Sequence, residues 1–320
     1  MPPHGKPLLR GLAVLTTSLW YAGYTVAGPA IPEHGSSNVD DPATAVEGPV
    51  FATPTRLDRI GRIVAPVTIN GQGPFRFIVD SGASRSAISA GLAARLGLTL
   101  DPTRQITVKG VTGSQAVPSV PIAYLQAGDL TLEDQRLPVL ADFVFADTDG
   151  ILGVEGLAGM CLLVDFQYDR LSITRKRPKH LKGQWSHVPV QLRFGQLMVA
   201  TARIGGTRVE AVIDTGAERT LGNLALRRAL GLDVAAQTAS TQRWVLGATS
   251  ATEQGNSIPS PAIRIGEAGI RRLEITFGDL NVFRLWGLED RPALVLGMDV
   301  LGTTQGLLLD YGRRELLVRL

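Results

Sequence analysis

The chain of 320 residues contains one cysteine, Cys161, and only four histidines. A single cysteine excludes an internal disulfide and any metal site built from several cysteines. The histidines show no metal-ligand spacing of the HExxH kind; they are His4, His34, His180 and His187. We therefore expect no metal and no cofactor, and we predict that Cys161, in the apolar run "GMCLLVDF", is a buried core residue.

The chain also lacks a strong excess of either charge, since 32 basic residues accompany 29 acidic ones and the net charge is +3. No stretch carries the concentrated positive field that nucleic-acid binding requires. The one basic cluster, "RKRPKH" at residues 175–180, is typical of a solvated linker. The sequence therefore predicts no nucleic-acid partner.

Charged residues are absent from residues 11–28, "GLAVLTTSLWYAGYTVAG", which follow Lys6 and Arg10. This pattern predicts an export signal over residues 1–27 that is cleaved after Ala27, and an uncleaved membrane anchor is the alternative. In both cases we expect the bulk of the protein to be exported, either periplasmic or secreted. Residues 28–55, rich in Pro, Gly, Ser, Asp and Glu, are predicted to form a flexible linker.

What the chain has in abundance is glycine and proline, with 36 and 19 residues, beside 44% hydrophobic residues. This composition is typical of a globular protein that is rich in turns and strands. The length allows two domains of about 130 to 150 residues, each large enough to bury its own core.

An internal repeat supports the division into two domains. Residues 64–98 and 197–232 each show alternating residues, a glycine-containing turn and a returning apolar run that ends in an aspartate, Asp80 or Asp214. Each pattern predicts a β-hairpin followed by a short helix that ends at "LGL". Residues 149–173 and 293–318 are also similar to each other.

The fold class that follows is mainly β, with two related lobes, a pseudo-twofold axis and a cleft between the lobes. We predict an N-terminal lobe over residues 56–175, an inter-lobe linker over residues 176–188 and a C-terminal lobe over residues 189–320.

The two aspartates point to acid–base chemistry. A carboxylate after an apolar strand is unfavourable unless it is hydrogen-bonded, and each aspartate is followed by a hydroxyl residue and a glycine. A pseudo-twofold axis would bring the two carboxyl groups together, where they would share one proton. One carboxylate could then take a proton from water while its protonated partner hydrogen-bonds a scissile carbonyl group.

The motifs "FIVDSGAS" and "AVIDTGAERT", with the later "GILGVEGL" and "LVLGMDVL", resemble those of the retropepsin-like and pepsin-like aspartic proteases. The resemblance spans nearly all of residues 60–320. It implies that Asp80 and Asp214 are the catalytic pair. It also implies supporting positions around the pair, which are Ser81, Gly82, Thr215, Gly216, Gly153 and Gly297.

Two glycine-rich stretches, residues 108–117 and 245–255, resemble the paired flaps of the retroviral enzymes, and neither contains the flap tyrosine of single-chain pepsin-like enzymes. We predict that substrate is covered by Gly110, Gly113, Trp244 and Gly247. A further difference between the halves is that Glu155 stands where the second copy has Asp299.

The leading hypothesis is an exported aspartic endopeptidase that cleaves an extended segment of a protein or peptide. A monomer is expected, because two lobes in one chain complete the site. The rival hypothesis is a non-catalytic peptide-binding or envelope scaffold protein of the same fold. A serine or cysteine hydrolase has less support, because the chain lacks a GxSxG elbow and a histidine partner for Cys161.

Overall fold

The computed structural model describes residues 13–15, 53–54, 56–57, 61–232, 241–271 and 273–320. The predicted export signal, residues 1–27, and the predicted linker, residues 28–55, therefore lie almost entirely outside the described residues. Three residues of the former are described as strand β1 (Ala13–Leu15), which runs parallel to β17 (Gln242–Leu246). Among the helices of the described residues, none has the length and apolar character needed to cross a membrane.

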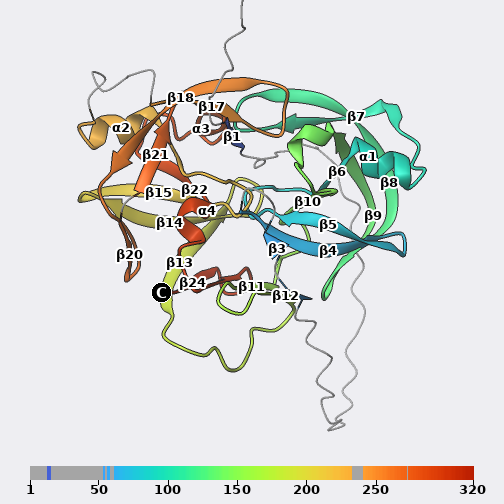
Figure 1. The fold of residues 1–320 in the computed structure, drawn as a ribbon, viewed down its shortest axis with the longest axis horizontal. Helices are drawn as coiled ribbons and strands as arrows, with labels where there is room; N and C mark the ends of the chain where they lie inside the picture. The colour runs from blue at the N-terminus through green and yellow to red at the C-terminus, as the bar shows by residue number, and fades with distance from the viewer. Residues whose placement is uncertain (1–12, 16–52, 55, 58–60, 233–240, 272) are drawn as a thin grey trace, which may run out of the picture.

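The fold is mainly β, as predicted, and the described strands form one sheet of eight strands and one of sixteen (Figure 1). The eight-stranded sheet has the order β3-β4-β5-β10-β6-β9-β8-β7 and belongs to the N-terminal half. Its strands are β3 (Arg56–Leu57), β4 (Ile63–Ile69), β5 (Gln72–Val79), β6 (Ala87–Ser89), β7 (Asp101–Lys109), β8 (Ser114–Ala127), β9 (Leu130–Leu140) and β10 (Gly150–Leu152). Helix α1 (Ala90–Arg95) and the short 3-10 helix η1 (Asp142–Val144) complete this half.

The sixteen-stranded sheet carries the C-terminal half and also takes in strands from the N-terminal half. Its further strands are β2 (Thr53–Pro54), β11 (Cys161–Asp165), β12 (Arg170–Thr174), β13 (Ser186–Arg193), β14 (Leu197–Ile204), β15 (Thr207–Ile213), β16 (Leu221–Gly222), β18 (Thr252–Ser260), β19 (Ile263–Ile265), β20 (Ala268–Ile270), β21 (Leu273–Phe277), β22 (Ala293–Leu296), β23 (Gly306–Asp310) and β24 (Glu315–Arg319). The helices of this half are α2 (Leu224–Ala229), α3 (Asn281–Leu285) and α4 (Met298–Leu301).

The two sequence repeats adopt the same local structure. Each hairpin, β4–β5 and β14–β15, is followed by a helix whose first turn is capped by a side chain, that of Ser89 in α1 and that of Asn223 in α2. Each helix ends at the glycine of its "LGL", where Gly97 and Gly231 both have φ +63, a conformation that glycine adopts without strain. The local sequence pattern is therefore sufficient to explain the repeated hairpin–helix unit.

A sheet shared by both halves lies at the bottom of Figure 1, on the side opposite the hairpins β7–β8 and β17–β18. Its strand order is β13-β24-β23-β11-β12-β2, so the two halves meet where β11 pairs antiparallel with β23. Leu163 pairs with Leu308 at the centre of that junction. The pairing fixes the two lobes relative to each other through backbone hydrogen bonds.

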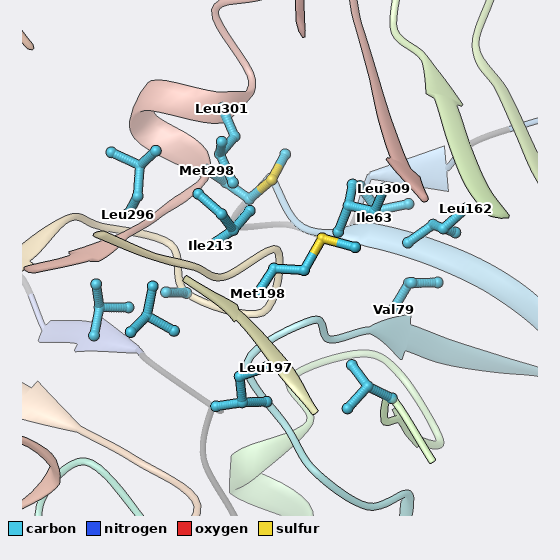
Figure 2. Close-up of a cluster of buried hydrophobic side chains, with 14 of the residues drawn as sticks. Ile63, Val79, Leu162, Leu197, Met198, Ile213, Leu296, Met298, Leu301 and Leu309 are labelled. Carbon is cyan, nitrogen blue, oxygen red and sulfur yellow. The ribbon is translucent and has the colours of Figure 1, made fainter. Parts of the chain in front are cut away.

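An apolar cluster continues from one lobe into the other beneath the middle of the molecule. Figure 2 shows side chains from both lobes in this cluster, with labels on Ile63, Val79, Leu162, Leu197, Met198, Ile213, Leu296, Met298, Leu301 and Leu309. Burying a side chain of this size contributes about 1.5–3 kcal/mol. Val79 and Ile213, the last residues of β5 and β15, belong to this cluster, so the loops that follow them begin in a buried apolar environment.

Candidate active site

The two aspartates occupy equivalent places at the ends of β5 and β15. The N–H of Asp80 donates to the carbonyl of Leu152 at 2.9 Å, and the N–H of Asp214 donates to the carbonyl of Leu296 at 3.1 Å. Both side chains are buried, with exposed fractions of 1% and 0%. The hairpins thus deliver both carboxyl groups to buried positions.

Each carboxyl group is held by its own loop. Oδ1 of Asp80 accepts from the N–H of Gly82 at 2.9 Å. Oδ1 of Asp214 accepts from the N–H of Gly216 and from that of Ala217, both at 2.9 Å. Such bonds offset part of the cost of burying a carboxylate.

Four hydrogen bonds made by Ser81 and Thr215 connect the two loops, two to the opposite strands and two between the residues themselves. The Ser81 hydroxyl donates to the carbonyl of Ile213 at 2.9 Å, and the Thr215 hydroxyl donates to the carbonyl of Val79 at 2.6 Å. Each hydroxyl also accepts from the N–H of the other residue at 3.0 Å. The small hydroxyl residues predicted to support the pair therefore join the lobes directly.

Gly82 and Gly216 are required because each lies against the carboxyl group of the opposite lobe. A β-carbon at Gly82 would overlap the carboxyl group of Asp214, and one at Gly216 would overlap that of Asp80. Only a residue without a side chain allows this approach. The structure consequently brings Asp80 and Asp214 together across the pseudo-twofold axis.

Gly153 and Gly297 lie directly after β10 and β22, the strands that run parallel to β5 and β15. The N–H of Gly153 donates to the hydroxyl of Ser86 at 3.0 Å, and that of Gly297 donates to the hydroxyl of Thr220 at 3.2 Å. A β-carbon at either glycine would overlap the backbone of the loop above it. Both positions therefore support the loops that carry the aspartates.

A second pair of carboxyl groups holds the far ends of these loops. Asp299 accepts from the N–H of Thr220 at 3.1 Å and from its hydroxyl at 2.7 Å. Glu155 accepts from the N–H of Ser86, and its Oε2 is buried without a hydrogen-bond partner among the described residues. Sequence analysis noted Glu155 and Asp299 but missed the residues that they hold. Ser86 and Thr220 could have been found from the sequence, because each lies the same number of positions after the aspartate of its repeat.

Burial and mutual charge perturb the acidity of the pair. Burial raises the pKa of Asp80 well above its usual range, and the negative charge of Asp214 raises it further. The N–H of Gly82 and the charge of Arg62 act in the opposite direction, lowering the pKa of Asp80. Two carboxyl groups placed in this way retain one proton between them over a wide pH range.

The predicted flap residues lie in two hairpins that touch each other, the glycines in the turns and Trp244 in a strand. Gly110 and Gly113 flank the β7–β8 turn, whereas Gly247 begins the β17–β18 turn and Trp244 lies in β17 with 41% of its surface exposed. The tips meet where the hydroxyls of Thr112 and Thr249 are 3.3 Å apart. The structure thus joins the two hairpins, and their covering of a substrate stays a prediction.

The possible metal ligands and the single thiol have the following positions in the described part of the chain. Within the part of the chain that the structure describes, no group of three His, Cys, Asp or Glu residues is arranged to hold a metal ion. Cys161 is buried, and burial raises the pKa of its thiol to about 12. A thiol of this kind is inert as a nucleophile.

Comparison with protein families agrees with the geometry. Residues 65–155 and 200–300, together more than half of the chain, match the model of the aspartyl protease family. The chain belongs to the aspartyl protease family. Each matched region of this aspartyl protease contains one aspartate of the pair and the glycine that supports its loop, Gly153 or Gly297. No curated protein matches the chain.

Proposed function

We propose that the protein is an exported aspartic endopeptidase in which Asp80 and Asp214 activate a water molecule for attack on a peptide bond. The observation that carries this proposal is the position of each carboxyl group against the glycine of the opposite loop. Because the charge of Asp214 raises the pKa of Asp80, one carboxyl group keeps a proton while the other is ionised. The ionised group takes the proton from water, and the protonated group donates a hydrogen bond to the scissile carbonyl and then to the tetrahedral intermediate.

The substrate that we propose is an extended segment of a protein or peptide, bound between the aspartates and the joined hairpin tips at Thr112 and Thr249. Extended peptides bind to sheet edges through main-chain hydrogen bonds. Because the tips are in contact, entry of a substrate requires them to separate. We propose no covalent intermediate, since the ionised group activates water rather than attacking the substrate.

The test is cleavage of a peptide library across acidic and neutral pH, with and without a pepstatin-type inhibitor. We expect inhibitor-sensitive cleavage by the native protein, and loss of more than about a thousandfold in kcat/KM for Asp80→Asn and for Asp214→Asn, since each removes one partner of the acid–base pair. Asp134→Asn is the matched control, because Asp134 is exposed and has φ +49, which asparagine adopts readily.

Thermal unfolding of the three variants separates loss of chemistry from loss of fold. Cleavage that persists at the native rate in either dyad variant would contradict the assignment of the pair. Absence of cleavage by the native protein at every pH would favour the peptide-binding scaffold.

We further propose that the protein acts outside the cytoplasm as a monomer, either periplasmic or secreted, or anchored by an uncleaved N-terminal segment. The support for export is the uncharged stretch at residues 11–28, which follows Lys6 and Arg10. The support for a monomer is that one chain supplies both aspartates. Mass spectrometry of the mature N terminus, together with cell fractionation and light scattering, tests all three statements. An intact N terminus in the cytoplasmic fraction would contradict export.

A further inference from the structure

The N-terminal hairpin places a buried arginine across from Asp80. Val64 and Ile78 form the last pair of the antiparallel ladder between β4 and β5. Extending that register by two positions beyond the ladder aligns Arg62 with Asp80, and the charge of Arg62 acts on this carboxyl group. Arg62 has an exposed fraction of 0%, so its side chain lies wholly within the protein.

The C-terminal hairpin has an apolar residue at the equivalent position. Val199 and Val212 form the last pair of the ladder between β14 and β15, and the same extension by two positions aligns Leu197 with Asp214. Leu197 is also buried, and Figure 2 shows it within the apolar cluster. The two repeats therefore differ at this position, where the Asp80 side has a charged side chain and the Asp214 side has a hydrocarbon side chain.

A second difference between the repeats also places a polar group near Asp80. The N–H of Tyr311 donates to the carbonyl of Met160, and the N–H of Phe166 donates to that of Gln305, both at 3.0 Å. Met160 and Gln305 directly precede β11 and β23, so Tyr311 and Phe166 are equivalent. Burial raises the pKa of Tyr311, and the charge of Asp80 raises it further, which places this phenol within electrostatic reach of the carboxylate.

In the loops that follow the two aspartates, it is Asp214 that has the additional polar contact. The N–H of Ala217 donates to the carboxylate of Asp214 at 2.9 Å. The N–H of Ala83, its counterpart, donates instead to the main-chain carbonyl of Asp80 at 3.2 Å. The carboxylate of Asp214 thus receives two backbone N–H bonds from its loop, and that of Asp80 receives one.

We propose that Arg62 is a positioning residue that stabilises the ionised form of Asp80 across the hairpin, in the role that the second backbone N–H performs for Asp214. This inference rests on the proposed function of the pair. Among the described residues, the charged groups that act on Asp80 are Asp214 and Arg62, and the charge of Asp80 acts in turn on Tyr311. The charge of Arg62 lowers the pKa of Asp80, against burial and the charge of Asp214, which raise it. Arg62 therefore extends the pH range in which the pair carries one negative charge toward acid.

The first test is the pH profile of kcat/KM for Arg62→Met and Arg62→Lys. At an effective dielectric constant of about 20, a unit charge shifts the pKa of a carboxylate by about one unit from as far as about 12 Å, and by more at shorter distance. We expect the acid limb to move up by about one unit or more in Arg62→Met and to stay near its native position in Arg62→Lys. Leu197→Met is the matched control and should leave the profile unchanged. A folded Arg62→Met variant with the native profile would overturn the proposal.

The second test needs no catalysis and remains decisive if the variant is unstable. An interaction between Arg62 and ionised Asp80 disappears when Asp80 is protonated, so the stability lost in Arg62→Met should grow as the pH rises through the range in which the pair ionises. Urea unfolding from pH 3 to pH 9 measures this growth. Destabilisation of the same size at every pH would indicate a purely structural arginine and overturn the proposal.

The two tests also distinguish this inference from the proposed function. If the native protein cleaves nothing but Arg62→Met loses stability only as the pH rises, the coupling of Arg62 to Asp80 stands and the endopeptidase proposal fails. If Asp80→Asn abolishes cleavage while Arg62→Met changes neither the pH profile nor the pH dependence of stability, the endopeptidase proposal stands and the inference about Arg62 fails.

Discussion

Replacement of Glu155 by glutamine should change how the stability of the protein depends on pH. Burial raises the pKa of Glu155 from 4.5 to about 7, although hydrogen bonds from Ser86 oppose the effect. The carboxyl oxygen Oε2 is buried and has no hydrogen-bond partner among the described residues, so the charged form is poorly solvated. Glutamine has nearly the same shape as the protonated acid, and its carbonyl can still accept from the N–H of Ser86.

The sign and size of the effect follow from proton linkage. Between pH 4.5 and about 7 the unfolded chain loses the proton of Glu155 while the folded protein keeps it. The contribution of Glu155 to stability is therefore full below pH 4.5 and is lost as the pH rises through 7. One unit of pKa difference corresponds to about 1.4 kcal/mol, so the ionised side chain lowers the free energy of unfolding by about 3 kcal/mol at pH 8.

The assay is urea unfolding of the native protein and of Glu155→Gln from pH 4 to pH 8. We expect the free-energy difference between the two proteins to change by about 3 kcal/mol in favour of the variant as the pH rises. Taking this difference cancels the contributions of other titrating groups, including Asp80. Asp299→Asn is the companion variant and should act in the same direction, because burial raises the pKa of Asp299 as well. A difference that stays constant across this pH range would refute the reasoning.

Three further predictions concern the loops and the single thiol. Ser81→Ala leaves two buried backbone groups without their bonds and should lower the free energy of unfolding by about 2–5 kcal/mol in urea titrations, whereas Ser81→Thr, which copies Thr215, should stay near native. Gly216→Ala should reduce kcat/KM by about a hundredfold or more, because the new methyl group displaces the carboxyl group of Asp80. Gly269→Ala is the control, since a β-carbon there meets no other atom. Equal kcat/KM values for the two variants would contradict the assigned contact. Cys161 should resist a thiol reagent in the native protein and react after unfolding, and rapid native labelling would show that it is not buried.

Much of the local structure could be predicted from sequence because it depends on short-range patterns. Alternation of apolar and polar residues predicts the hairpins β4–β5 and β14–β15, and the "LGL" segments predict where α1 and α2 end. The repeat then predicts two lobes, since the same pattern occurs twice. The hydroxyl residue and glycine that follow each aspartate predict a turn at that point, because turn formation also depends on short-range sequence.

The contacts between the lobes could not be predicted in the same way. Ser81 and Ile213 are separated by 132 positions, and their hydrogen bond depends on how two sheets meet. The opposition of Arg62 and Asp80 follows from a strand register, which turn residues alone do not fix. The contact between Thr112 and Thr249 likewise depends on the relative positions of two hairpins.

The sequence by itself determined that this aspartyl protease has two lobes, each with an aspartate, a hydroxyl residue and a glycine at the end of an apolar strand. Periodicity and repetition carry that information because secondary structure and turns are local. Only the tertiary structure decided that the charge of the buried Arg62 acts on Asp80, and that Glu155 is desolvated. Acidity depends on burial and on the distances between charges, and both quantities exist only once the chain has folded.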